Sequence, residues 1–386
     1  MERTTEILIA LIGNEVCGRQ VELPPDFTSD EQLIIDLFVK ANEHDFTHII
    51  ASNLNKRKLL SGSAAQAYMA QLYSALFRNE KMNYAFENVC KALEERQIPY
   101  IPLKGAVLRS LYPEPWMRSS VDVDILVREQ DLNAAADIIK ERLGYRQSTS
   151  TNHDITLTPD GNILIELHFR LIEEEHKIAS IKILDDVWDY AKPVSENSFR
   201  YELCAPFFYF YHISHMAKHV VQGGCGIRPF LDLWLMNRHC DYTEEETRNL
   251  LRKGSMLKFA ESAERLSEVW FSGAEHTDLT RVLQDYIVKG GMFGTDETKM
   301  LSNQQHHGGK IKHILRRIFV SYRDLAYTYP IIKKYRFLTP FCEICRLFSL
   351  LFGKKKKFRK TYLANLNNIS AAYADNISIL FESIEL

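Results

Sequence analysis

Residues 98–127 read IPYIPLKGAVLRSLYPEPWMRSSVDVDILV, and this stretch decides the fold. The apolar run Ile98–Leu103 predicts a strand, Ala106–Leu111 a brief helix, and Val121–Val127 a second strand. Because side chains alternate along a strand, Asp122 and Asp124 face the same side of the sheet. Two adjacent carboxylates on an apolar strand are costly to bury without a partner, and a divalent cation with oxygen ligands would supply one. A sugar-binding or solvent-facing pair is the alternative.

A third acid follows in residues 153–171, HDITLTPDGNILIELHFRL. The dipeptide Asp160-Gly161 between two alternating runs predicts a hairpin, and Leu164, Glu166 and His168 share one face of its returning strand. The chain between Asp124 and Glu166 is long enough to bring the two strands side by side. Three acids on neighbouring strands would form a site for one or two Mg²⁺ ions, suited to phosphoryl or nucleotidyl transfer.

This arrangement resembles the nucleotidyltransferase superfamily whose best-known member is DNA polymerase β. More narrowly, the chain is similar to a poorly characterised bacterial nucleotidyltransferase family with L-K-G, then L-Y-P, R-x-x-x-D-x-D and E-x-H. The resemblance is strong over residues 98–171 and looser over the helical remainder. It implies that Asp122 and Asp124 are metal ligands, that Glu166 is the third catalytic acid and a further ligand, and that Gly105 lets the backbone approach the triphosphate.

The segment between the two aspartates and the first strand carries the expected phosphate ligands, which are Lys104, Gly105, Arg118, Ser119 and Ser120. A triphosphate keeps surplus negative charge, and the forked donors of an arginine suit it. The alternative is that Lys104 and Arg118 form ion pairs with the three site acids themselves. His168 is expected to orient a carboxylate or the acceptor, with a hydrogen bond to the backbone as the alternative.

A later helix places His212, His215 and His219 on one face, because they fall at i, i+3 and i+7. No acid or cysteine completes a zinc set at the usual spacing. The similar family also has H-x-x-x-H before a Gly-rich turn and an R-x-x-x-D helix, here Arg228 and Asp232. We therefore expect His215, His219, Arg228 and Asp232 to contact the acceptor or nucleotide or to support residues that do. Packing of this face against the sheet is the alternative.

The whole chain predicts an α+β fold, in which a small mixed sheet with helices on one face is flanked by predominantly helical regions. At 386 residues more than one domain is expected. The expected divisions are an N-terminal helical region over residues 1–80, a nucleotidyltransferase core over 81–195, a helical domain over 196–300 and a basic helical region over 301–386.

The composition is that of an ordinary globular protein, with 46% hydrophobic and 25% charged residues. The Met1 end carries no basic leader, so we do not expect a signal peptide. The sequence has no long uncharged apolar run, so we do not expect a membrane span. Its seven cysteines lack the spacing of a disulfide framework, which suits a cytoplasmic protein. Residues Lys310–Lys360 contain fifteen basic and two acidic residues, which favours an anionic partner or an acidic surface of the same chain.

The expected activity is Mg²⁺-dependent transfer of a nucleoside monophosphate (NMP) from a nucleoside triphosphate (NTP) to a hydroxyl of a small molecule, protein or RNA. One departure keeps an alternative open. The superfamily usually has Gly-Ser or Gly-Gly where this chain has Gly105-Ala106. A weakly active or inactive nucleotide-binding or interaction module of the same fold would tolerate that change.

Overall fold

The computed structural model describes residues 3–302 except 152, 160–162, 173–179, 242, 296 and 300, together with 322, 325, 329, 331–352 and 371–386. The predicted hairpin turn at Asp160-Gly161 and most of the basic segment Lys310–Lys360 lie outside these residues. Within the described part of the chain, no helix is both long enough and apolar enough to cross a membrane.

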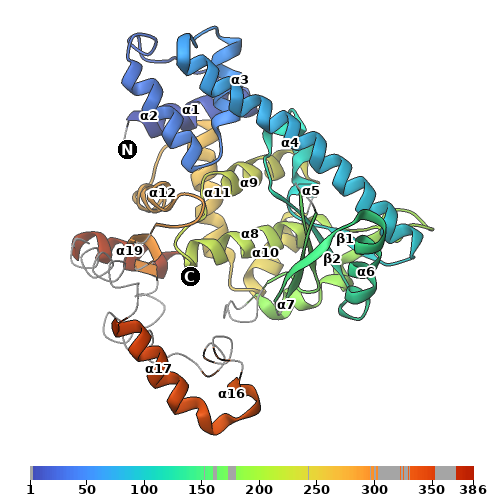
Figure 1. The fold of residues 1–386 in the computed structure, drawn as a ribbon. Coiled ribbons are helices and arrows are strands. Elements are labelled where there is room, and N and C mark those ends of the chain that lie inside the picture. The colour runs from blue at the N-terminus through green and yellow to red at the C-terminus, as the bar shows by residue number, and fades with distance from the viewer. Residues whose placement is uncertain are drawn as a thin grey trace.

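The N-terminal region is helical, as predicted, and consists of α1 (Arg3–Cys17), α2 (Glu31–Glu43), α3 (Thr47–Lys56) and the long α4 (Gly62–Glu95). The Asp30 carboxylate caps α2 by accepting from the backbone N–H of Leu33 at 2.9 Å. Figure 1 shows α4 running from the N-terminal helices past the sheet. The expected domain boundary at residue 80 falls inside α4, which is one continuous helix.

The two halves of α4 belong to different hydrophobic cores. Tyr68 and Leu72 join the larger core, which also takes in the N-terminal and C-terminal helices. Met82, Val89 and Leu93 join a smaller core beneath the sheet. The helix therefore stabilises both parts of the molecule.

The sheet is mixed and five-stranded, which confirms the α+β fold. Its order is β1-β2-β5-β4-β3. Only the β2–β5 pair is parallel, whereas β1–β2, β4–β5 and β3–β4 are antiparallel. The strands are β1 (Tyr100–Pro102), β2 (Asp122–Val127), β3 (Arg146–Ser150), β4 (Asp154–Thr158) and β5 (Leu164–His168).

The first strands are joined by the four-residue helix α5 (Gly105–Leu108) and two 3-10 turns, and α6 (Leu132–Leu143) follows β2. Helix α6 is capped at its C-terminus by Gly144, whose φ of +72° is left-handed. The sequence did not predict β3. Its residues RQSTS are all exposed, so they lack the apolar alternation that signals a strand.

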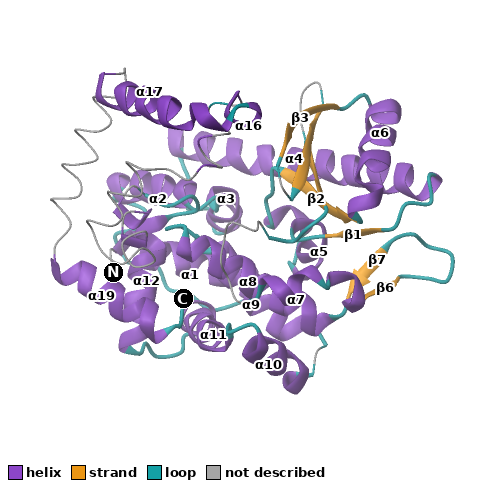
Figure 2. Cartoon of the chain, turned by 90° about the horizontal axis from the view of Figure 1, so that it is seen from below, coloured by secondary structure: helices purple, strands orange, loops and turns teal. Residues whose placement is uncertain are grey.

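Helices cover both faces of the sheet, so the expectation of helices on one face was wrong. Val123, Ile125, Ile165 and Leu167 point into the smaller core with α4 and α6. Leu126 belongs instead to the larger core, with residues of the helical body. Figure 2 shows α4 and α6 on one side of the strands, and α5 and the later helix α8 (Ala205–Val221) on the other. The face that carries the acids is therefore enclosed by the second set of helices.

Beyond the sheet the chain is mainly helical, but a two-stranded sheet that the sequence did not predict lies between residues 186 and 204. Its strands β6 and β7 are antiparallel, and Tyr100 of β1 forms an isolated bridge with Arg200 beside β7. The remaining elements are α7 (Ile181–Asp185), β6 (Ala191–Pro193), β7 (Tyr201–Leu203), α8 (Ala205–Val221), α9 (Arg228–His239), α10 (Glu244–Lys253), α11 (Leu257–Ser272), α12 (Asp278–Gly290), α16 (Ile331–Lys334), α17 (Thr339–Phe352) and α19 (Ala371–Ser383).

Candidate active site

Three carboxylates from two neighbouring parallel strands share one face of the sheet. Asp124 of β2 is the direct register partner of Glu166 of β5, and Asp122 pairs with Leu164. Because alternate residues of a strand point the same way, Asp122 lies on the side of Asp124 and Glu166. The structure thus brings together the three acids that the sequence singled out.

Asp124 is buried and receives two donors on the same oxygen. Its Oδ1 accepts from Lys104 Nζ at 2.8 Å and contacts His168 Nε2 at 2.7 Å. Burial opposes ionisation of this carboxyl, but the Lys104 charge and the His168 hydrogen bond outweigh burial and lower the Asp124 pKa. The same contacts raise the pKa of Lys104 and that of His168 against the effect of burial. These contacts therefore favour the charged form of each of the three groups.

Asp122 has the opposite shift. Burial and the neighbouring Asp124 charge raise its pKa, although the Ser120 hydroxyl donates to Asp122 Oδ1 at 2.8 Å. Such crowding of like charge is relieved by a divalent cation. Oxygen or nitrogen ligand atoms of Asp124, Glu166 and His168 also lie within 4.8 Å of one another. Asp124, Glu166 and His168 therefore form a group that could hold a metal ion. The carboxylates of Asp124 and Glu166 are the kind of oxygen ligand that Mg²⁺ prefers, and Asp122 lies beside them on the same face of the sheet.

The turn before α5 is tightly built around Lys104 and Gly105. Lys104 has a φ of +42°, which is unusual for a residue with a side chain. A Cβ atom at Gly105 would lie 2.9 Å from Nη1 of Arg118. A larger residue here would displace the Arg118 guanidinium, because that side chain packs directly against the Gly105 backbone.

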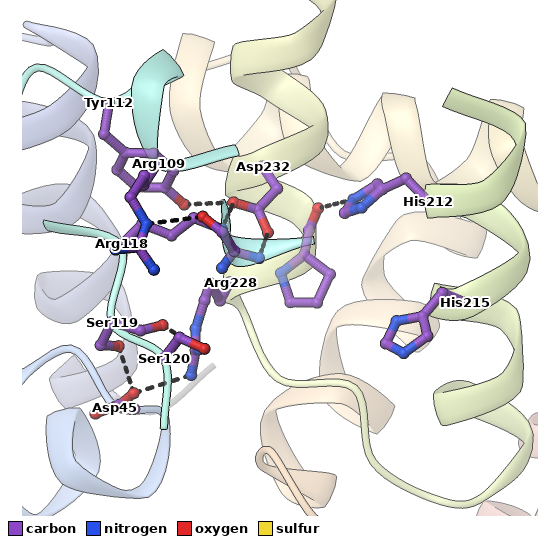
Figure 3. Close-up of polar contacts among 12 residues, drawn as sticks. Asp45, Arg109, Tyr112, Arg118, Ser119, Ser120, His212, His215, Arg228 and Asp232 are labelled. Carbon is purple, nitrogen blue, oxygen red and sulfur yellow. Dashed lines mark hydrogen bonds and ion pairs between the residues drawn. The ribbon is translucent and has the colours of Figure 1, made fainter. Parts of the chain in front are cut away.

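Arg118 is held by Asp232 of α9 in a forked, buried ion pair. Its Nε and Nη2 atoms donate to the two Asp232 oxygens at 2.9 Å each, and the Tyr112 hydroxyl donates to Asp232 Oδ1 at 2.8 Å (Figure 3). The side chains of Arg118 and Asp232 are 9% and 1% exposed. Burial opposes ionisation of Asp232, but Arg118 outweighs it and lowers the Asp232 pKa. The expected phosphate ligand Arg118 is thus ion-paired with Asp232, which is not one of the three site acids that the sequence offered as its partner.

Arg228 lies one turn before Asp232 on α9 and contacts Ser119, the residue that follows Arg118 in the loop before β2. Its guanidinium donates to the Ser119 carbonyl at 2.7 Å and to Asp45 Oδ2 at 2.9 Å. The Ser119 hydroxyl also donates to Asp45, as Figure 3 shows. The R-x-x-x-D pair of α9 therefore fixes the loop that leads into β2 and ties it to the turn between α2 and α3.

The three histidines of α8 do not converge. His212 Nε2 contacts the Pro229 carbonyl at 2.9 Å, whereas His215 and His219 approach each other at 3.3 Å between their Nε2 atoms. Burial, followed by the neighbouring His219, lowers the pKa of His215 well below 6.5. The metal-capable groups of three found in the described part of the chain lie on the sheet and not on this helix.

Tyr211 is a residue that the sequence analysis missed. It lies on α8 one turn before His215 and is 2% exposed, yet its hydroxyl has no hydrogen-bond partner among the described residues. Burial raises its pKa, and the charges of Lys104, Asp124 and Glu166 all act on it. Its spacing of four residues from His215 was a usable signal, because both then lie on one helix face.

Comparison with known families identifies the class of this protein. A family model described as "Uncharacterised nucleotidyltransferase" matches residues 33–272. The chain therefore belongs to this nucleotidyltransferase family, as the L-K-G and D-x-D patterns indicated. A search of curated proteins gave no significant match.

Among solved structures, the antibiotic-resistance factor ANT(2'')-Ia is similar at 12% sequence identity, over 50% of this chain and 91% of its own, with a TM-score of 0.28.

Proposed function

We propose that this chain transfers an NMP unit from an NTP to an acceptor hydroxyl in a Mg²⁺-dependent reaction. The observation that carries the proposal is the register of β2 and β5, which sets Glu166 beside Asp124 with Asp122 on the same face. The family supports transfer of a nucleotidyl group in general, and the carboxylate cluster supports the metal.

Asp122, Asp124 and Glu166 would hold the ions. When bound, Mg²⁺ supplies charge stabilisation for the attacking and leaving oxygens. In the reaction, a bond forms between the acceptor oxygen and the α-phosphorus, the bond to the pyrophosphate oxygen breaks, and the acceptor proton passes to Glu166. Glu166 suits this role because its side chain is 25% exposed, whereas that of Asp124 is 4% exposed.

The surrounding residues position these groups. His168 and Ser120 hold Asp124 and Asp122 through hydrogen bonds of 2.7 and 2.8 Å. Lys104 is the cation next to the acids, so we assign to it and Gly105 the contact with the leaving phosphates. We assign Arg118, Ser119, Arg228 and Asp232 to holding the loop before β2, since their polar groups bond to one another or to Asp45.

The acceptor or nucleotide would meet the face of α8 that carries Tyr211 and His215. A buried hydroxyl without a partner costs free energy unless a ligand completes it. We place the reaction in the cytoplasm, because all seven cysteines are free thiols in the structure.

The test is isothermal titration with Mg-ATP and Mg-CTP, together with release of pyrophosphate and transfer of label from α-labelled NTP to a cell extract. The double variant Asp122→Asn with Asp124→Asn should lose at least about a hundredfold in turnover, because it removes charged metal ligands. Asp137→Asn, an exposed acid on α6, is the matched control. Unchanged binding and turnover in the double variant would refute the proposal.

The alternative function, nucleotide binding without transfer, is favoured by one observation. Lys104 already neutralises Asp124 at 2.8 Å, so the acidic cluster is partly compensated without a metal. In that case titration would show NTP binding by the wild type, and no acceptor in the extract would take up label.

A further inference from the structure

We propose that the chain carries a second metal site, for Zn²⁺ or a similar first-row dication, formed by His153, Asp154 and His168. It lies on the sheet next to the carboxylate cluster and is distinct from it. One ligand atom from each of these three side chains lies within 4.8 Å of the other two.

The strand register brings the three side chains together. Asp154 is the direct partner of His168 across β4 and β5. The backbone carbonyl of His153 accepts from the Phe169 N–H at 2.9 Å, so His153 is anchored beside the end of β5. His153 and His168 ring centroids are 5.9 Å apart, a spacing at which both imidazoles can reach one ion.

His168 gives an independent indication of a ligand. Its Nε2 is engaged with Asp124 at 2.7 Å, but its Nδ1 is buried and has no hydrogen-bond partner among the described residues. A buried ring nitrogen without a partner is costly, and a metal ion would complete it. His168 also belongs to both groups of candidate ligands.

The ligand atoms are sheltered but reachable. The side chains of His153 and Asp154 are 13% and 8% exposed, and the Nδ1 and Oδ1 atoms lie 3.8 Å apart. The Thr151 hydroxyl donates to Asp154 and so orients that carboxylate. Such supporting contacts are typical of metal sites.

The donor set decides which metal the site would take. Two imidazoles and one carboxylate with an open position are typical of Zn²⁺ and related first-row ions, whereas Mg²⁺ prefers oxygen ligands. An ion on Nδ1 would leave the Nε2–H of His168 to donate to Asp124, as in a carboxylate–histidine–zinc arrangement. The metal would thereby fix the orientation of His168, which contacts Asp124 of the carboxylate cluster.

The experiment loads the full chain with Zn²⁺ in the presence of millimolar Mg²⁺, removes free ion by gel filtration and measures bound zinc by mass spectrometry. We expect about one Zn²⁺ per chain in the wild type. His153→Ala and Asp154→Asn should each bind at least about tenfold more weakly in competition with a chromophoric chelator. His239→Ala, an exposed histidine on α9, is the matched control and should bind like the wild type.

A second readout is the visible absorption of the Co²⁺-loaded chain, which should lose its intensity in both site variants. If His153→Ala does not fold, the zinc binding of the near-isosteric variant Asp154→Asn decides the test. A wild type that retains no Zn²⁺, or variants that retain as much as the wild type, would overturn the proposal. No nucleotide is present, so the result is independent of whether the chain transfers NMP.

Discussion

Arg118 and Asp232 form a forked ion pair with two hydrogen bonds of 2.9 Å, although 114 residues separate them. The pair joins the loop before β2 to helix α9, and the Tyr112 hydroxyl completes it at 2.8 Å. Because β2 carries Asp122 and Asp124, this contact couples the helical body to the acidic face of the sheet.

The first prediction concerns the stability of this pair. Asp232→Asn leaves the Arg118 charge buried without its partner, so we expect the free energy of unfolding to fall by about 3 kcal/mol in urea titration. The control is Arg248→Gln, which breaks an exposed pair with Glu244 on α10 and should cost much less. Equal costs for the two variants would show that Arg118 does not depend on Asp232.

The second prediction separates binding from structure at Tyr211. Since its hydroxyl is buried without a partner within the described structure, Tyr211→Phe should leave the free energy of unfolding unchanged or raise it. If the hydroxyl contacts acceptor or nucleotide, kcat/KM for label transfer should fall about tenfold.

The matched control for Tyr211 is Tyr286→Phe, because the buried Tyr286 hydroxyl donates to the Val220 carbonyl at 2.9 Å. Its loss should cost about 1 kcal/mol of stability. Unchanged kinetics in Tyr211→Phe would remove this residue from the proposed acceptor face.

The third prediction concerns competition between Lys104 and a metal. The Lys104 ammonium contacts Asp124 Oδ1 at 2.8 Å and so stands where a cation is favoured. Lys104→Met should lower the melting temperature in EDTA, and it should increase the rise in melting temperature on adding Mg²⁺ or Mn²⁺, because the competing charge is gone. A smaller metal-induced rise than in the wild type would mean that Lys104 and the ion do not compete.

The fourth prediction is a pH dependence at His168. Burial disfavours the imidazolium, but hydrogen bonds to Asp124 and Glu166 outweigh it and raise the folded pKa above 6.5. Protonated His168 therefore stabilises the fold fully below about pH 6.5, and this contribution is lost as pH rises through the folded pKa. The difference in free energy of unfolding between the wild type and His168→Gln, measured in EDTA, should therefore become smaller as the pH rises. A difference that grows with pH would contradict it.

The fifth prediction is a pH dependence of stability at His215, with the opposite sign to that at His168. Burial, followed by His219, lowers its pKa well below 6.5, so the folded state holds it neutral. Stability should fall as pH drops below about 6.5, where the unfolded chain takes up a proton that the folded chain resists. His215→Gln should weaken this loss in acid, as measured by urea unfolding between about pH 5 and 7. An unchanged acid dependence would show that other groups cause it.

The sequence by itself determined the family, the fold class and the strands that carry the acids. Alternation along residues 121–127 and 164–168 was sufficient to place Asp122 with Asp124 and Glu166 with His168, because the period of a strand is a local property. It could not reveal β3, whose polar residues carry no periodic signal.

Only the tertiary structure decided which side chains the site residues contact. The register of β2 against β5 sets Asp124 beside Glu166, and the packing of α9 pairs Arg118 with Asp232. Likewise, His168 meets His153 and Asp154 only through the neighbouring strand β4. These contacts join residues far apart in the chain, so their energies depend on burial and geometry that no local pattern specifies.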